Sequence, residues 1–456
     1  MRARLTIEMT AARLVGRLSR AAGRGGGTTL PGKLLWKVDP GAMDALAARL
    51  PHGVAVVSAT NGKTTTSAML ARILGKRYRL AWNNSGANLA SGVASTLLTA
   101  PDADLGLLEV DEFALPEVMR RVRPRAVSLG NLFRDQLDRY GELEHIAERW
   151  RDAVRELPPT STLVVNADDP LVAALADGRS SVLRFGLDDR RLARPALQHA
   201  ADSKYCVRCG APYEYAAAYV GHLGEYHCPS CGHARPPLDL AARAIELHGL
   251  GGSSFDLVTP AGTTRLRLPL PGLYNVYNAL AASAVALALD ATLDEISSGL
   301  GAFTAAFGRF ERIESGDRRI LMLLIKNPAG ANEAVRTLEE GGVPGTLVIA
   351  LNDRIADGRD VSWIWDVDFE PLLERAERIV ASGERAAELA LRFTYAGFPR
   401  GRLEVIPDLR EALDRGLALV KPGESLGILP TYTAMLELRA IAAARGLVRP
   451  FWEQTE

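Results

Sequence analysis

The chain has 456 residues, 47% of them hydrophobic and 24% charged, with 54 basic and 54 acidic side chains and a formal net charge of +0. This composition is typical of a globular protein and excludes a mainly disordered or collagen-like chain. The balanced charge argues against a protein that binds nucleic acid through its overall charge. No apolar run approaches the roughly 18 residues that a membrane-spanning helix needs. Arginines interrupt the N-terminal apolar runs, so we expect a cytoplasmic protein without a secretory signal.

A phosphate-binding loop is the first chemical motif, and it follows an N-terminal segment of residues 1–50. Residues 54–57 are all apolar, which predicts a buried parallel strand, and residues 67–74 have helical spacing. Between them lies S-A-T-N-G-K-T-T-T, in the strand–loop–helix context that a P-loop requires. Backbone N–H groups at the start of such a helix hold phosphate oxygens. We expect Lys63 to reach the β- and γ-phosphates of a nucleotide and Thr64 to bind Mg²⁺.

The loop departs from the strict G-x4-G-K-[ST] pattern, because Val57 stands where that pattern has glycine. G-K-T alone is a weak signal, so a plain strand–helix turn is the alternative interpretation. The predicted nucleotide-binding residues of this loop are Thr60, Asn61, Gly62, Lys63, Thr64 and Thr65.

The four cysteines of the chain form a single motif. Cys206, Cys209, Cys228 and Cys231 have the spacing C-x2-C-x18-C-x2-C of a zinc ribbon, and a glycine follows each pair. A knuckle often needs positive φ at such a glycine. Four thiolates close a tetrahedral shell, so we expect a structural Zn²⁺, with disulfides as the weaker alternative. With all four thiols on zinc, the chain has no cysteine left to act as a nucleophile.

Two α/β domains are expected after the N-terminal segment. The central ATP-binding domain is predicted at residues 51–305, with the ribbon inserted at residues 202–237. The C-terminal domain is predicted at residues 306–456. Its apolar stretches alternate with stretches of helical spacing, at residues 321–325, 332–340, 347–351 and 370–378. This alternation predicts a doubly wound parallel sheet.

Six further segments accompany T-N-G-K-T-T in a recognisable order. They are N-N-S-G-A-N from residue 83, L-L-E-V-D-E from 107, N-L-F-R-D-Q-L-D from 131, N-A-D-D-P from 166, G-L-Y-N-V-Y-N-A-L-A-A from 272 and G-R-F-E from 308. Together they resemble the Mur ligase family, the ATP-dependent amide-forming enzymes of cell-wall synthesis. The resemblance implies a P-loop ATPase fold for the central domain. It also implies that Glu109 binds Mg²⁺ and acts with Lys63 in catalysis.

Three more residues take their expected roles from the same resemblance. It implies that Asn275, Asn278 and Arg309 contact the nucleotide. Helix capping is the alternative role for the two asparagines, and an ordinary turn is the preferred interpretation of D-D-P at residues 168–170. Two positions depart from the family pattern: Ala59 replaces a glycine, and Gln136 replaces a histidine, which argues against a second metal there.

Within the family, three features resemble the MurT branch, the synthetase subunits of lipid II isoglutaminyl synthase. They are the four-cysteine insertion, the string L-I-K-N-P-A-G from residue 324, and the segments at residues 352–366 and 431–436. The resemblance implies ATP-dependent amidation of the α-carboxyl of D-glutamate in the lipid II stem peptide, giving D-isoglutamine. ATP would form an acyl phosphate, which ammonia then attacks. The expected place of work is the inner face of the membrane, where lipid II is presented.

The resemblance also implies a partner, a GatD-like glutaminase that supplies ammonia and forms a heterodimer with this chain. The absence of a spare cysteine favours such a separate subunit. In the family an aspartate of the C-terminal domain is thought to complete the partner's Cys-His pair by orienting the histidine. Asp360 is the preferred candidate for that catalytic role, with Asp357 and Asp366 as alternatives.

Two other functions compete with this hypothesis. One is an amino-acid-adding ligase of the Mur or folylpolyglutamate type, against which the cysteine insertion and the K-N-P string argue. The other, from a different class, is a zinc-ribbon nucleic-acid-binding module with a nucleotide site, in which tyrosines near the ribbon would stack on bases. Packing within a small domain is the preferred explanation for those tyrosines, and the balanced charge argues against this module.

Overall fold

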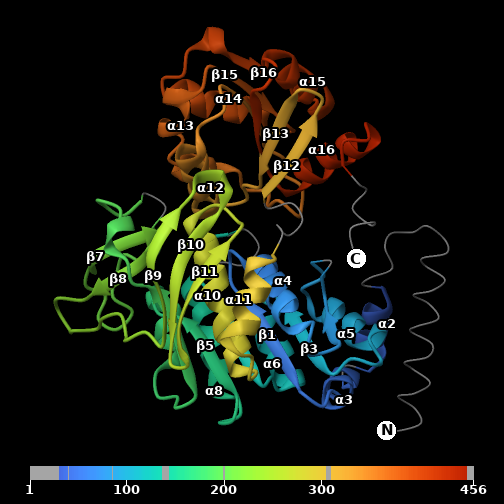
Figure 1. The fold of residues 1–456 in the computed structure, drawn as a ribbon, viewed down its shortest axis with the longest axis vertical. Helices are drawn as coiled ribbons and strands as arrows, with labels where there is room; N and C mark the ends of the chain where they lie inside the picture. The colour runs from blue at the N-terminus through green and yellow to red at the C-terminus, as the bar shows by residue number, and fades with distance from the viewer. Residues whose placement is uncertain are drawn as a thin grey trace.

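The computed structural model describes residues 30–39, 41–84, 86–135, 143–198, 201–303 and 310–448. Arg309 and Gln136, both singled out in the sequence, lie outside the described residues. The chain folds into two α/β units that follow each other in sequence, and a small β-hairpin lies beside the first unit (Figure 1). No helix among the described residues is long and apolar enough to cross a membrane.

A nine-stranded sheet forms the centre of the first unit, in the order β11-β10-β9-β6-β5-β4-β1-β3-β2. The seven strands from β2 to β9 in that order run parallel, and β10 and β11 extend the edge as antiparallel strands. The central strands β1, β3 and β4 are buried along their whole length because helices cover both faces of the sheet. The strands are β1 Val54–Ser58, β2 Leu80–Trp82, β3 Leu105–Glu109, β4 Ala126–Leu129, β5 Thr162–Asn166, β6 Val182–Leu187, β9 Leu240–Leu247, β10 Ser253–Thr259 and β11 Gly262–Leu268.

Two hydrophobic cores lie on opposite faces of this sheet. One face is covered by α4 (Lys63–Leu74), α10 (Leu273–Ala288) and α11 (Leu293–Gly301). The other face is covered by α2 (Leu30–Val38), α3 (Ala42–Ala48), α5 (Ala90–Thr99), α6 (Leu115–Val122), α8 (Leu143–Arg155) and α9 (Pro170–Ala173). Alternate residues of β1 point to the two cores, Ala55 and Val57 to the first, Val54 and Val56 to the second. The P-loop therefore leaves a strand that is fixed on both sides.

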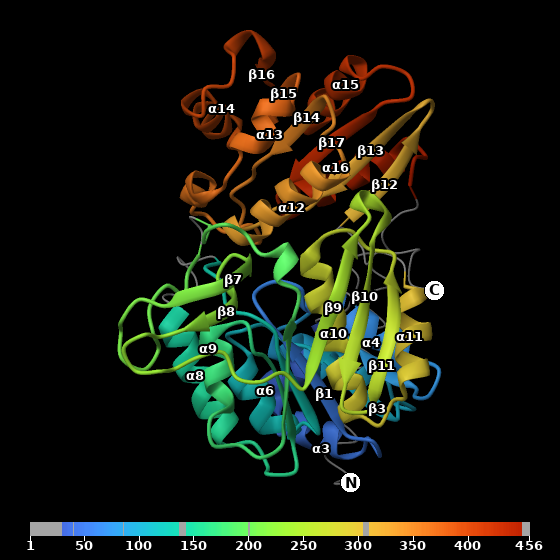
Figure 2. The same cartoon turned by 60° about the vertical axis from the view of Figure 1, so that its left-hand side comes forward.

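The ribbon is a separate antiparallel hairpin of β7 (Glu214–Val220) and β8 (Leu223–His227), which lies beside the central sheet (Figure 2). The glycine after each cysteine pair has positive φ, 74° at Gly210 and 73° at Gly232, as the knuckle geometry predicts. The tyrosines of the hairpin pack inward: Tyr213 and Tyr226 are buried with their ring centroids 5.1 Å apart. Packing thus accounts for these two rings.

The second unit is a six-stranded sheet in the order β12-β13-β17-β14-β15-β16, parallel except for the edge strand β12. Helices cover both faces, so the expected doubly wound sheet is confirmed. The helix predicted at residues 370–378 is shorter than expected and covers Glu370–Arg375. The backbone becomes extended at Ala376, and β15 begins at Arg378. The elements are β12 Phe310–Ser315, β13 Arg318–Leu323, α12 Pro328–Gly341, β14 Thr346–Ala350, α13 Glu370–Arg375, β15 Arg378–Ser382, α14 Ala386–Tyr395, β16 Leu403–Val405, α15 Leu409–Leu419, β17 Ser425–Pro430 and α16 Tyr432–Ala444.

Candidate active site

The phosphate-binding loop joins β1 to α4, as predicted. Gly62 adopts φ of 92°, a left-handed conformation that favours glycine, and a Cβ there would lie 2.0 Å from Asn278 Oδ1. The end of β4 holds the loop from the other side. Asn131 accepts from the Asn61 backbone N–H at 2.9 Å and donates to its carbonyl oxygen, also at 2.9 Å. Both the left-handed backbone and the close contact with α10 therefore require glycine at position 62.

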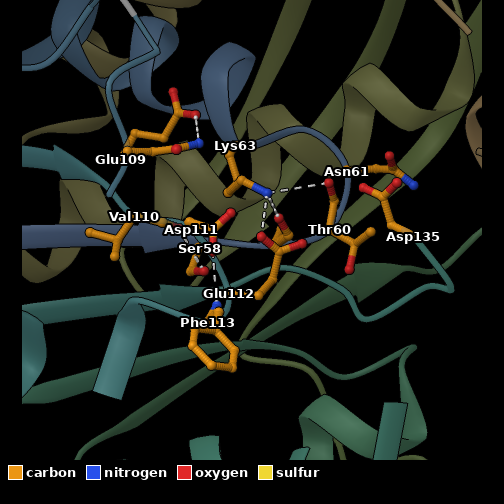
Figure 3. Close-up of polar contacts among 12 residues, drawn as sticks. Ser58, Thr60, Asn61, Lys63, Glu109, Val110, Asp111, Glu112, Phe113 and Asp135 are labelled. Carbon is orange, nitrogen blue, oxygen red and sulfur yellow. Dashed lines mark hydrogen bonds and ion pairs between the residues drawn. The ribbon is translucent and has the colours of Figure 1, made fainter. Parts of the chain in front are cut away.

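Lys63 is buried and forms an ion pair with Glu112 (Figure 3). Its Nζ lies 2.7 Å from Glu112 Oε2 and also donates to the Ala59 carbonyl oxygen. Burial disfavours the charge on Lys63, but Glu112, with Asp111 and Glu109 nearby, raises its pKa above the ordinary value. Glu112 shows the reverse: burial opposes its charge, yet Lys63 and Lys326 lower its pKa. Each group thus favours the charged form of the other.

Glu109 and Thr64 meet at the end of β3, which is the expected magnesium site. Thr64 Oγ1 donates to Glu109 Oε1 at 3.2 Å, and Asn88 donates to the same oxygen at 3.3 Å. Asn83 fixes the Glu109 backbone on both sides, with hydrogen bonds of 2.8 and 2.7 Å. A hydroxyl and a carboxylate are hard oxygen ligands of the kind that Mg²⁺ takes alongside water and phosphate oxygens. These residues therefore fit the ion.

The predicted asparagines of α10 lie against the loop. Asn278 Oδ1 accepts from Thr66 Oγ1 at 3.4 Å, and Asn278 Nδ2 donates to Asn275 Oδ1 at 3.0 Å. Asn275 in turn donates to the Pro271 carbonyl oxygen at 2.7 Å, so part of its role is to hold the start of α10. Both the nucleotide-contact and the helix-start interpretations are therefore compatible with the position of Asn275.

An open pocket of about 800 Å³ begins at the P-loop and extends between the two units. Its central-domain wall includes Asn61, Gly62, Thr65 and Asn278, all predicted nucleotide-binding residues, together with Phe133 and Tyr277. The opposite wall comes from β13 and α12, and the tip of the ribbon hairpin completes the rim through Val220 and Leu223. The pocket is mostly apolar with polar groups at the loop, which is the usual character of a nucleotide site.

The second unit sends two residues to the P-loop that sequence reasoning did not assign to the site. Lys326 Nζ lies 2.5 Å from Asp135 Oδ2 and 3.3 Å from the Thr60 carbonyl oxygen. Asn327, the N-cap of α12, donates to Asn61 Oδ1 at 3.1 Å. Glu112 was also missed, although it belongs to the same L-L-E-V-D-E string as Glu109. Glu112 follows the carboxyl end of β3, and ligands of open α/β sheets bind at the carboxyl ends of the strands. That position was the signal that could have indicated Glu112.

The four cysteines lie together, as the spacing predicts. Their Sγ atoms all lie within 4.8 Å of one another, with 3.5 Å from Cys206 to Cys231 and from Cys209 to Cys228. Such distances are too long for disulfides. A tetrahedral Zn²⁺ with Zn–S bonds of about 2.3 Å needs sulfur atoms about 3.8 Å apart, so the cluster fits a closed zinc site.

The three candidate aspartates occupy different environments. Asp357 is buried and accepts from the Thr433 backbone at 2.7 Å and from its hydroxyl at 2.5 Å, while burial raises its pKa. Asp366 lies 3.5 Å from Arg134 of the central unit. Asp360 is exposed, and one carboxylate oxygen accepts from the Ser362 backbone N–H at 2.9 Å. Of the three, Asp360 presents a carboxylate most openly to a partner.

Comparison with known proteins agrees with this geometry. The Mur ligase middle domain family matches residues 57–228, and the MurT ligase C-terminal family matches residues 324–435. Subunit MurT of the glutamine-hydrolysing lipid II isoglutaminyl synthase from Streptococcus pneumoniae is 35% identical, over 93% of this chain and 94% of that protein. The chain belongs to the MurT family. It is therefore a ligase subunit built on the Mur ligase fold.

Solved structures show the same fold at lower identity. A pseudomurein peptide ligase type C from Methanothermus fervidus superposes with a TM-score of 0.69 at 23% identity, covering 88% of this chain and 80% of that one. MurF ligase from Thermotoga maritima in complex with ADP gives a TM-score of 0.64 at 15% identity, covering 91% and 85%. The expected fold, a central Mur ligase domain with a four-cysteine insertion and a C-terminal α/β domain, is confirmed.

Proposed function

We propose that this chain is the synthetase subunit that amidates the D-glutamate α-carboxyl of the lipid II stem peptide, using ATP and ammonia from a GatD-like glutaminase. The observation that carries the proposal is the P-loop in which Lys63, Thr64 and Glu109 converge, within a MurT-family chain. The name of the Streptococcus pneumoniae relative describes a glutamine-hydrolysing lipid II isoglutaminyl synthase. That name supports both the substrate and a partner that hydrolyses glutamine.

The reaction needs a leaving group on an otherwise unreactive carboxylate. A carboxylate oxygen attacks the γ-phosphorus of ATP, the bond to the β-phosphate oxygen breaks, and an acyl phosphate and ADP form. Ammonia then attacks the acyl carbon, inorganic phosphate leaves with the C–O bond electrons, and a proton is lost from nitrogen. The protein contributes positioning and stabilisation of charge on the transferred phosphoryl group.

Individual residues have distinct roles in this scheme. Lys63 turns from Glu112 to the β- and γ-phosphates, whose negative charge then replaces that of Glu112 beside the ammonium group. Thr64 and Glu109 would hold Mg²⁺, which neutralises phosphate charge when bound. Lys326 brings a second cation to the loop from the C-terminal domain. Thr60 and Asn61 provide loop backbone whose position Asn131 fixes.

Ammonia supply is assigned to the partner because the four cysteines of this chain are grouped in one cluster. We propose that Asp360 orients the partner's catalytic histidine across the interface, since it is exposed and retains one carboxylate oxygen outside its bond to Ser362. The complex would act where lipid II meets the cytoplasm.

A reconstituted assay tests the proposal. The chain is combined with a candidate glutaminase, lipid II, Mg²⁺-ATP and either glutamine or ammonium, and mass spectrometry follows the change from acid to amide in the stem peptide. We expect amide with both nitrogen sources, and none after Lys63→Ala. Lys76→Ala, at an exposed position just beyond the same helix, is the matched control and should remain active. A stem peptide extended by an added amino acid, instead of a primary amide, would favour the amino-acid-adding ligase. Amide formed without consumption of ATP would contradict the proposal.

A further inference from the structure

The turn of the ribbon hairpin is buried in the central unit, although connecting turns usually lie at the surface. His222, which stands between β7 and β8, is completely buried. Gly221 beside it has φ of 58°, and a Cβ there would lie 2.7 Å from the ring of Phe133. The rings of His222 and Phe133 are tilted against each other, with centroids 4.6 Å apart. Through this turn the ribbon contacts the segment that follows β4.

Hydrogen bonds continue from this contact to the P-loop. The Phe133 backbone N–H donates to Thr60 Oγ1 at 3.1 Å. The neighbouring Leu132 N–H donates to Asp169 Oδ2 at 2.9 Å, and the same oxygen lies 3.4 Å from His222 Nε2. Thr60 is a predicted nucleotide-binding residue. His222 therefore lies two contacts away from the nucleotide-binding loop.

The hairpin joins two hydrophobic cores. Near the turn, Tyr219 and Leu223 belong to the same core of the central sheet as Phe133, and Leu223 also lines the pocket. At its other end the ribbon has a small core of its own, which includes the cysteines Cys206 and Cys228. An isolated two-stranded hairpin is marginally stable at best, and a metal held by four thiolates supplies folding energy in so small a unit. The order of the hairpin, and with it the position of its turn, therefore depends on the cysteine site.

We propose that His222 is a positioning residue that couples the ribbon to the nucleotide site, so that a metal held by the four cysteines strengthens nucleotide binding. The inference rests on the proposed ATP-dependent function and gives the ribbon a part in it. Cys228 lies six residues beyond His222, just after β8, which at about 3.4 Å per residue is about 20 Å along the strand. The effect passes through the hairpin, the Phe133 ring and the Thr60 hydroxyl.

The test compares ADP binding by the zinc-loaded and the zinc-depleted full chain. Isothermal titration calorimetry with Mg²⁺-ADP is carried out below the unfolding midpoint of the depleted protein. We expect removal of zinc by a chelator to raise the Kd for ADP about fivefold or more, the lower end of typical couplings between two sites. Because such coupling is reciprocal, Mg²⁺-ADP should raise the affinity for zinc by the same factor, measured by competition with a chromogenic chelator.

Variants separate this coupling from general stabilisation. His222→Ala should keep its zinc, bind ADP about fivefold or more weakly, and show little further loss when zinc is removed, because the connection is already broken. His222→Phe keeps a ring against Phe133 and should bind ADP within about twofold of the unaltered chain. His145→Ala, at an exposed position on α8, is the matched control and should respond to zinc removal as the unaltered chain does. A His222→Ala variant that lowered stability but kept the Kd for ADP would show a purely structural role and contradict the proposal.

Hydrogen–deuterium exchange locates the effect in the absence of nucleotide. When zinc is removed, the peptide that contains Leu132 and Phe133 should exchange faster, because the turn that packs against it is loosened. The peptide that contains β14 in the second unit should be unchanged. Faster exchange throughout both units would indicate general unfolding and would count against a specific connection.

Two results with the unaltered protein distinguish this inference from the proposed function. Equal Kd values for ADP with and without zinc would overturn the coupling while leaving the proposed function intact. Failure of the zinc-loaded chain to bind ADP would contradict the proposed function itself, and this inference with it.

Discussion

At the scale of single residues, the P-loop is notable for a lysine that already has an anionic partner. Lys63 and Glu112 are both buried and lie 2.7 Å apart. Removing one member of a buried pair leaves an uncompensated charge, which typically costs about 3–5 kcal/mol. Glu112 is therefore expected to contribute to stability as well as to the electrostatics of the P-loop.

The first prediction concerns this pair and pH. Glu112→Gln should lower the thermal unfolding midpoint at pH 7. The pKa of Glu112 is lower in the folded protein than its ordinary value of 4.5. The contribution of Glu112 to the free energy of unfolding is therefore complete above pH 4.5 and is lost as pH falls through the folded-state pKa. The difference between wild type and variant should thus shrink under acid conditions. Glu117→Gln, in an exposed pair with Arg120, should change stability by about 1 kcal/mol or less. A difference that grew on acidification would contradict the assignment.

The second prediction separates two neighbouring aspartates. If exposed Asp360 orients the partner's histidine as proposed, Asp360→Asn should reduce glutamine-dependent amidation while sparing ammonium-dependent amidation. Asp357→Asn should instead lower stability, since its carboxylate accepts two hydrogen bonds from Thr433 inside the fold. Activity assays with both nitrogen sources, beside thermal unfolding, make the comparison. Equal loss of both activities in Asp360→Asn would exclude the proposed role.

At the scale of elements, the sequence predicted those features whose residues lie close together along the chain. The strand–loop–helix of the P-loop and the four-cysteine cluster were found because their residues are close in sequence or share a rigid spacing. The contributions of Lys326 and Asn327 were not, because each reaches the loop across 266 residues of sequence. The burial of His222 depends on the packing of the hairpin turn against the central unit, which no periodicity indicates.

The third prediction belongs to the ribbon. The purified chain should contain one Zn²⁺ for its four thiolates, and Cys228→Ser, at a buried ligand position, should lose the metal. Metal binding energy is folding energy in such a site, so the unfolding midpoint should fall by about 5 °C or more. Elemental analysis and calorimetric scans measure both quantities, and restoring zinc after chelation should restore the midpoint of the unaltered protein. Unchanged midpoints after complete zinc removal would contradict a structural role.

At the scale of the whole molecule, polar contacts join the two units around the pocket. Lys326 pairs with Asp135, and Arg336 of α12 donates to the Tyr219 carbonyl oxygen in the ribbon hairpin at 3.0 Å. Figures 1 and 2 both show α12 at the boundary between the units. The doubly wound sheet of the second unit was predictable from alternating apolar and helical stretches. The way the two units face each other was not, since it depends on these long-range pairs.

The fourth prediction tests this arrangement. Lys326→Met leaves the largely buried carboxylate of Asp135 without its cation and removes a contact to the P-loop, so stability should fall by about 1–3 kcal/mol. A nucleotide bound between the units should then stabilise the variant less, and the thermal shift caused by ADP should shrink. Lys421→Met, which alters an exposed pair with Glu424, is the control. An undiminished ADP shift would show that Lys326 does not help to form the site.

The pairing of Lys63 with Glu112 has a consequence for selectivity. Because Glu112 already places an anion beside Lys63, we expect a phosphate that reaches this lysine to compete with Glu112 for it. A small monoanion offers too few contacts to compensate for the separation of a buried pair. On the proposed function, a chelated triphosphate would reach the lysine, the metal ligands and the backbone amides together and so would compensate. We therefore expect Glu112 to lower the affinity of the loop for small inorganic anions more than its affinity for a nucleotide.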